Sequence, residues 1–263
     1  MMRGTERTPD EELAQSRDVL EWALRTKGRN DPLSIKAMID VADQLARQER
    51  GAEESVLRRE AVVALRDSVG PEHESTVNAE FRLAVCLTGH GQAQQAGALL
   101  AHVVAARTLA LGPNAPETLV AVAWSASAAK QCGELHEARH LQEQVVRGWE
   151  AAGTPPDDGR ATMAAMNLAS TLADLGDLDE ASRVLRGVLD ARRGMRGSDD
   201  AGSLDVLEAL TNVTLAAGDV SEATQLARSL LEKRAHADGS DGDGAVTRAR
   251  ALLALAEDRA GDR

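Results

Sequence analysis

One stretch of the sequence has the residue types and spacing of a metal-activated catalytic site. His136, Glu137 and His140 match the pattern H-E-x-x-H. On a helix this spacing places both imidazoles on one face to bind Zn²⁺, with the glutamate as general base for the bound water. A third ligand is missing, because no glutamate lies between Glu150 and Glu180 and no further histidine follows at a suitable distance. A zinc-dependent hydrolase is therefore a remote alternative, and adventitious metal binding by the two histidines is favoured over catalysis.

The rest of the sequence offers little other chemistry. It has no phosphate-binding G-x-x-x-x-G-K-[S/T] motif. The acidic, glycine-rich stretch 238–244 has wrongly placed glycines for a calcium loop and lacks the twelfth-position glutamate, so we interpret it as a flexible joint. Cys86 and Cys132 fall in different predicted helices and are expected to be free, buried thiols. We expect no catalytic residues, no bound metal and no cofactor.

Four glycines open near-identical segments and reveal an internal repeat. Gly91, Gly133, Gly176 and Gly218 are spaced by 42, 43 and 42 residues, and an alanine follows each of them five positions later. Apolar residues recur seven and eight positions after each alanine, which is the spacing of one helical face. An earlier, slightly shortened copy is predicted to begin at Gly51. Each segment is therefore the second helix of a helix–turn–helix unit.

The helix before each turn glycine is predicted to be its hairpin partner. It is marked by the pattern Leu-Ala-x-x-Leu at 83–87 and 168–172, and Gly-Pro pairs at 70–71 and 112–113 separate the units. The predicted organisation is a disordered N-terminus at 1–9, a capping helix within 10–30, five helix pairs across 31–237, and an acidic joint with a capping helix at 238–263. One such hairpin cannot bury its apolar face alone, so stacked neighbours must share a core.

Composition and charge restrict the possible partners. The net charge of −12 opposes binding to nucleic acid and to anionic membrane surfaces. No apolar run approaches the roughly 20 residues that cross a bilayer, and no signal peptide is apparent. With no tyrosine and one phenylalanine, the core must consist mainly of alanine and leucine. We expect a cytoplasmic protein whose partner is a protein or peptide; its oligomeric state stays open.

The repeat resembles the tetratricopeptide repeat (TPR), in its variant of about 42 residues found in kinesin light chains. The segment 167–181, Asn-Leu-Ala-Ser-Thr-Leu-Ala-Asp-Leu-Gly-Asp-Leu-Asp-Glu-Ala, carries the resemblance best. It implies an all-α, right-handed α-solenoid of stacked helix–turn–helix repeats. It also implies a concave groove, built from the first helices, that binds peptides or partner proteins. Similar arrays in bacteria serve as docking or sensor modules of regulators.

Helical geometry then selects the residues that line such a groove, one set from each first helix. The candidate binding residues are Asn78, Arg82, Trp124, Lys130, Met163, Asn167, Ser170 and Asn212, with Lys36, Asp40, Asp43 and Asp205 on the same predicted face. The family resemblance gives Asn167 a hydrogen bond to the ligand backbone, whereas Trp124 is equally interpretable as a groove anchor or a core residue. The leading hypothesis is a non-catalytic, regulatory binding scaffold or adaptor. A sensor of a small ligand or signalling peptide is the alternative.

Overall fold

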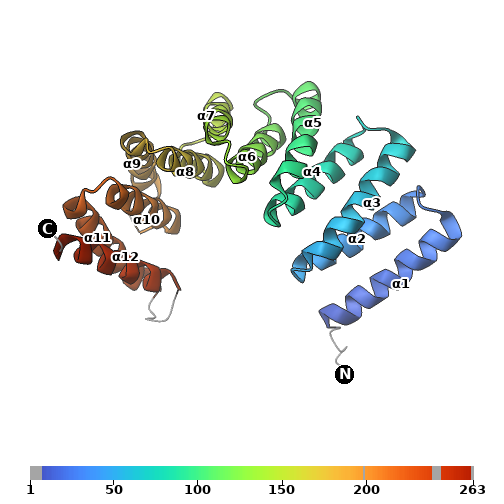
Figure 1. Ribbon diagram of the computed structural model, residues 1–263, viewed down its shortest axis with the longest axis horizontal. Helices are drawn as coiled ribbons and strands as arrows, with labels where there is room; N and C mark the ends of the chain where they lie inside the picture. Colours follow the sequence, from blue (N-terminus) through green and yellow to red (C-terminus); the bar gives the residue numbers. More distant parts are fainter. Residues whose placement is uncertain (1–7, 198, 239–243, 262–263) are drawn as a thin grey trace. The chain divides into compact units, whose positions relative to one another are not determined.

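The computed structural model describes residues 8–197, 199–238 and 244–261, and within these ranges the chain forms twelve α-helices and no strand (Figure 1). The helices are α1 (Pro9–Lys27), α2 (Pro32–Arg47), α3 (Gly51–Val69), α4 (Glu74–Gly89), α5 (Ala93–Leu111), α6 (Pro116–Gln131), α7 (Leu135–Ala151), α8 (Gly159–Asp174), α9 (Leu178–Arg196), α10 (Ala201–Ala216), α11 (Val220–Asp238) and α12 (Gly244–Gly261). The predicted all-α class is confirmed.

The chain divides into two compact units. The first, Met1–Gly133, contains α1 to α6, and the second, Glu134–Arg263, contains α7 to α12. Within each unit every helix packs against the next one along the chain, as in a TPR solenoid. The cores consist mostly of leucine, valine and alanine, as the composition predicts.

Helix length distinguishes the two kinds of helix in the repeat. The first helices of the pairs, α2, α4, α6, α8 and α10, each have 16 residues, whereas α3, α5, α9 and α11 have 19 and α7 has 17. Helix α1 also has 19 residues, and it ends at Gly28 with the backbone geometry found at Gly70, Gly112 and Gly197. Although expected only as a cap, α1 thus has the form of a second helix.

The turn inside the first hairpin differs from the prediction. Gly91, Gly133, Gly176 and Gly218 all have positive φ, and the residue with this geometry in the first hairpin is Glu49, with φ +57°. Glu49 stands 42 positions before Gly91, so the copy is of full length. Gly51 instead begins α3, where a Cβ atom would lie 1.7 Å from Nε2 of His90.

The two chain segments expected to lack structure fall largely outside the described residues. The predicted disordered N-terminus is described only from Thr8, whose hydroxyl oxygen accepts a hydrogen bond from the Glu11 amide and caps α1. Of the predicted joint at 238–244, only its two ends are described. Among the described helices, none combines the length and apolar character needed to cross a bilayer.

Candidate functional site

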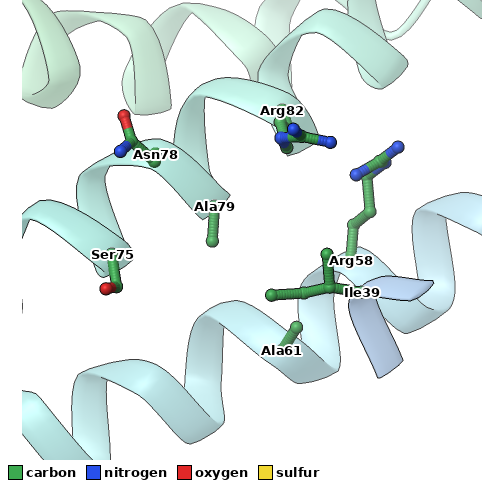
Figure 2. Close-up of a pocket in the computed structure, with 7 residues that line it drawn as sticks. All are labelled: Ile39, Arg58, Ala61, Ser75, Asn78, Ala79 and Arg82. Atoms are coloured by element: carbon green, nitrogen blue, oxygen red, sulfur yellow. The ribbon is translucent and has the colours of Figure 1, made fainter. Parts of the chain in front are cut away.

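Two of the predicted groove residues, Asn78 and Arg82, line one pocket of the first unit (Figure 2). The pocket holds about 270 Å³ and lies among α2, α3 and α4. We call it the α2–α4 pocket, and its lining residues are Ile39, Arg58, Ala61, Ser75, Asn78, Ala79 and Arg82. It therefore joins apolar side chains from three helices to polar groups of α3 and α4.

The charges around the α2–α4 pocket converge on Asp43 of α2. Its carboxylate accepts hydrogen bonds from Arg58 at 2.9 Å and from Arg82 at 2.9 and 3.0 Å. Arg58 is buried and also donates to the buried carboxylate of Glu54 at 2.6 Å. The Arg82 side chain is 55% exposed, so its guanidinium can reach a ligand while it still contacts Asp43. Arg58 has a structural role and Arg82 faces solvent.

Asn78 is exposed on α4, and its two amide atoms are in different situations. Its Oδ1 accepts a hydrogen bond from Arg107 of α5 at 3.0 Å, and Arg107 also donates to the backbone oxygen of Glu117 at 2.8 Å. Burial lowers the pKa of Arg107, whose guanidinium stacks 4.4 Å from the centre of the Phe81 ring. The Asn78 side chain is therefore held through its oxygen, and its Nδ2 remains a donor suited to a main-chain carbonyl.

Helix α4 is held in place by interactions at its N-terminus and, about two turns later, at Glu80. The His73 ring accepts a hydrogen bond from the Ser75 amide, and the Thr76 hydroxyl donates to the backbone oxygen of Gly70 at 2.7 Å. Further along, the fully buried Glu80 carboxylate contacts Arg66 of α3 at 2.6 Å and His102 of α5 at 2.5 Å. Because Thr76 and Glu80 are fully buried, their contacts fix the rotation of α4 and with it the exposed face that carries Asn78 and Arg82.

The two candidates on α6 are less accessible. Trp124 is half-buried and packs, together with Phe81, against the core cluster that contains Leu83, Leu87 and Leu100. Lys130, near the end of the same helix, is also half-buried. Of the two roles that the sequence left open for Trp124, this contact favours the core.

The remaining candidates belong to the second unit. Met163, Asn167 and Ser170 are exposed, and their spacing of four and three residues puts them on one side of α8. Asn212 is exposed on α10, where its Nδ2 donates to the backbone oxygen of Glu208 within the same helix. The structure thus separates the predicted set by unit: four members lie in each one.

The histidine pair of the H-E-x-x-H motif lies on α7. His136, Glu137 and His140 are all exposed. Across the described part of the chain, histidine, cysteine and carboxylate side chains form no group of three or more that could hold a metal ion. The zinc-dependent alternative therefore gains no third ligand from the described residues.

Sequence reasoning missed the pocket residues contributed by a second helix. The predicted groove contained only first-helix positions, whereas Arg58 and Ala61 come from α3. Ile39, one residue before the candidate Asp40, was also missed. The predicted succession of packed helices could have indicated that α3 also borders this site, because α3 packs directly against α4.

The architecture defines the class: an α-helical repeat protein of stacked helical hairpins. A tetratricopeptide-repeat family profile matches residues 162–201. The putative kinesin light chain TPR-like repeats of Podosopora anserina have a similar structure, with a TM-score of 0.73 and 24% identity, over 78% of this chain and 97% of that one. BtubC (BKLC) of P. vanneervenii is also similar, with a TM-score of 0.71 and 16% identity, over 90% of this chain and 95% of that one. The chain therefore has the tetratricopeptide-repeat fold in its kinesin-light-chain-like form, and residues 162–201 also match the family by sequence.

A third similar structure is a complex of a protein with a bound factor. A Rap protein complexed with competence and sporulation factor matches with a TM-score of 0.52 and 14% identity, over 98% of this chain and 78% of that one. No protein of curated function matches the sequence. The likeness to these structures shows the fold alone.

Proposed function

We propose that the protein is a non-catalytic scaffold or adaptor that binds a peptide segment of a partner protein in the α2–α4 pocket. The observation that carries this proposal is the position of exposed Asn78 and Arg82 beside the apolar Ile39, Ala61 and Ala79. An aliphatic ligand side chain would contact the apolar residues. Asn78 would donate to a ligand carbonyl, and Arg82 would bind a carbonyl or carboxylate. Proteins with this repeat fold commonly serve as interaction scaffolds.

The size of the pocket supports a peptide over a compact small molecule. Sites for drug-sized ligands usually enclose about 300 to 1,000 Å³ and bury most of the ligand. The α2–α4 pocket holds about 270 Å³, and one of its polar walls, Arg82, is 55% exposed. This volume suits one or two side chains of a chain that continues along the surface.

A signalling peptide is the second candidate ligand. The similarity to the Rap protein, whose structure contains competence and sporulation factor, motivates it. A sensor must couple binding to a change of state, whereas a scaffold need not. Small-angle scattering with and without bound peptide distinguishes the two: a change in the radius of gyration on binding supports the sensor, and unchanged dimensions support the scaffold.

The test is selection of a displayed random-peptide library on the full chain, followed by affinity measurements of the recovered peptides by fluorescence anisotropy. Asn78→Ala and Arg82→Ala should each weaken binding by about five- to thirtyfold, the effect of losing roughly 1–2 kcal/mol. Asn114→Ala and Arg193→Ala are matched controls, since both residues are exposed and lie outside the pocket. Peptides that bind all four variants alike would refute the assignment of the pocket.

A further inference from the structure

The first unit contains a second pocket, between α1 and α2, that is built like the α2–α4 pocket. It holds about 350 Å³, and we call it the α1–α2 pocket; its lining residues are Gln15, Ser16, Val19, Leu33, Lys36, Ala37 and Asp40. Six of these stand 42 positions before residues of the α2–α4 pocket: Ser16 before Arg58, Val19 before Ala61, Leu33 before Ser75, Lys36 before Asn78, Ala37 before Ala79, and Asp40 before Arg82. The two pockets are therefore successive copies of one structural feature.

The equivalence depends on α1 acting as a second helix, and the contacts of α1 support this. Arg17 of α1 donates to Glu53 of α3 at 2.5 Å. Arg59, 42 positions later on α3, makes the corresponding contact with Gln95 of α5 at 2.7 Å. Both links join one second helix to the next. Thus α1 places Ser16 and Val19 beside α2 as α3 places Arg58 and Ala61 beside α4.

The next copy of this feature, between α5 and α6, has different side chains. Another 42 positions along, the counterparts of Arg58 and Arg82 are Leu100, which is fully buried, and Trp124, which packs against the core cluster containing Leu100. Large apolar side chains therefore occupy the space that is open in the two earlier copies. Within the first unit, a ligand that follows the first helices finds two equivalent pockets, α1–α2 and α2–α4.

The chemistry of the α1–α2 pocket is specific. Val19 and Leu33 are 46% and 40% exposed, so the pocket offers apolar surface that a ligand can bury. The Asp40 carboxylate is exposed, and no described residue forms an ion pair with it. This contrasts with Asp43, one turn later, which binds two arginines. An aliphatic wall beside a carboxylate fits a lysine or arginine side chain, whose stem is apolar and whose end is cationic.

We propose that the α1–α2 pocket binds a basic side chain of the same peptide that occupies the α2–α4 pocket, with the aliphatic stem on Val19 and Leu33 and the cationic group on Asp40. This inference rests on the proposed function. Lys36 stands where the α2–α4 pocket has Asn78, and it donates to the ligand backbone as Asn78 does. Arg82 stands where the α1–α2 pocket has Asp40, so a basic side chain is repelled from the α2–α4 pocket. Opposite charges at equivalent positions set one register for the peptide.

The test uses the same displayed library, selected in parallel on the wild-type chain and on Asp40→Lys. Peptides selected on the wild type should carry lysine or arginine at a constant sequence distance from the peptide residue whose contribution to binding is lost in Arg82→Ala. Selection on Asp40→Lys should replace that basic residue by aspartate or glutamate and keep the rest of the motif. Asp67→Lys is the matched control, because Asp67 is exposed on α3 outside both pockets, and it should leave the motif unchanged.

Affinity measurements on one selected peptide complete the test. Replacing its basic residue by glutamate should weaken binding to the wild type by about two- to fivefold or more, as for a partly exposed ion pair, and Asp40→Lys should restore it. Peptides that need Arg82 but show no basic preference, or keep one on Asp40→Lys, overturn this inference alone. Absence of any peptide that depends on Asn78 or Arg82 overturns the proposed function and this inference with it.

Discussion

Removing the cations that face Glu80 should destabilise the first unit more than removing the Glu80 charge itself. The Glu80 side chain is fully buried, and its carboxylate contacts Arg66 at 2.6 Å and His102 at 2.5 Å. The Arg66 side chain is 44% exposed and that of His102 is 30% exposed, so both can be hydrated where they stand. Water cannot hydrate the buried carboxylate in the same way, and leaving such a group without an ion-pair partner costs about 3–5 kcal/mol.

The asymmetry gives distinct magnitudes for three variants. The double variant Arg66→Met/His102→Leu leaves the Glu80 carboxylate without either partner, so the free energy of unfolding at pH 7 should fall by about 3–5 kcal/mol. Glu80→Gln leaves Arg66 and His102, both accessible to solvent, facing an amide in place of the carboxylate, so the loss should be about 1–2 kcal/mol. Adding Glu80→Leu to the double variant replaces the network with apolar side chains and should recover most of the lost stability, because such replacements are often neutral.

The assay is urea unfolding followed by far-ultraviolet circular dichroism, with native-state hydrogen exchange of the α4 and α5 amides. Hydrogen exchange is needed because repeat arrays do not always unfold in one step. If the double variant is as stable as Glu80→Gln, or if Glu80→Leu destabilises it further, the reasoning about the buried carboxylate is wrong.

Three further predictions follow from single residues. Hydrogen bonds to Glu80, and secondly to Glu72, raise the pKa of His102. The stabilising contribution of His102 is therefore complete below the ordinary histidine pKa of about 6.5 and is lost as the pH rises through the raised pKa. His102→Gln should flatten this part of the stability–pH profile in urea titrations. Glu49→Gly should raise the free energy of unfolding by up to about 1 kcal/mol, because Glu49 has φ +57° and glycine adopts this conformation without strain, and a loss of stability would contradict that account. Burial raises the pKa of the Cys86 thiol to about 11, whereas the expectation that Cys132 is also buried is wrong, because Cys132 is exposed. In native protein a thiol reagent should therefore modify Cys132 quickly and Cys86 only on unfolding, and two fast thiols would contradict the burial of Cys86.

Much of the fold could be predicted because its signals are local. The recurrence of glycine at intervals of 42 and 43 residues marks the turns, and the helical spacing of apolar residues marks the faces that are buried. Asn78 and Arg82 could be identified by the same reasoning, since their place on a first helix depends only on helical geometry. Glu49 shows the limit of predicting turns from glycine spacing: the positive-φ turn conformation is present there without a glycine.

The sequence alone determined that consecutive helical hairpins stack, where most turns within the hairpins lie, and which side of most first helices faces away from the core. The tertiary structure decided which of those positions border a pocket. That outcome depends on the side chains of neighbouring helices: Ala61 and Arg82 border a pocket, whereas at the equivalent positions Val103 is fully buried and Trp124 packs against the core. It likewise decided that Asp43 is paired with arginines and that Asp40 is exposed. Periodicity specifies a direction for each side chain, and only packing specifies what the side chain meets there.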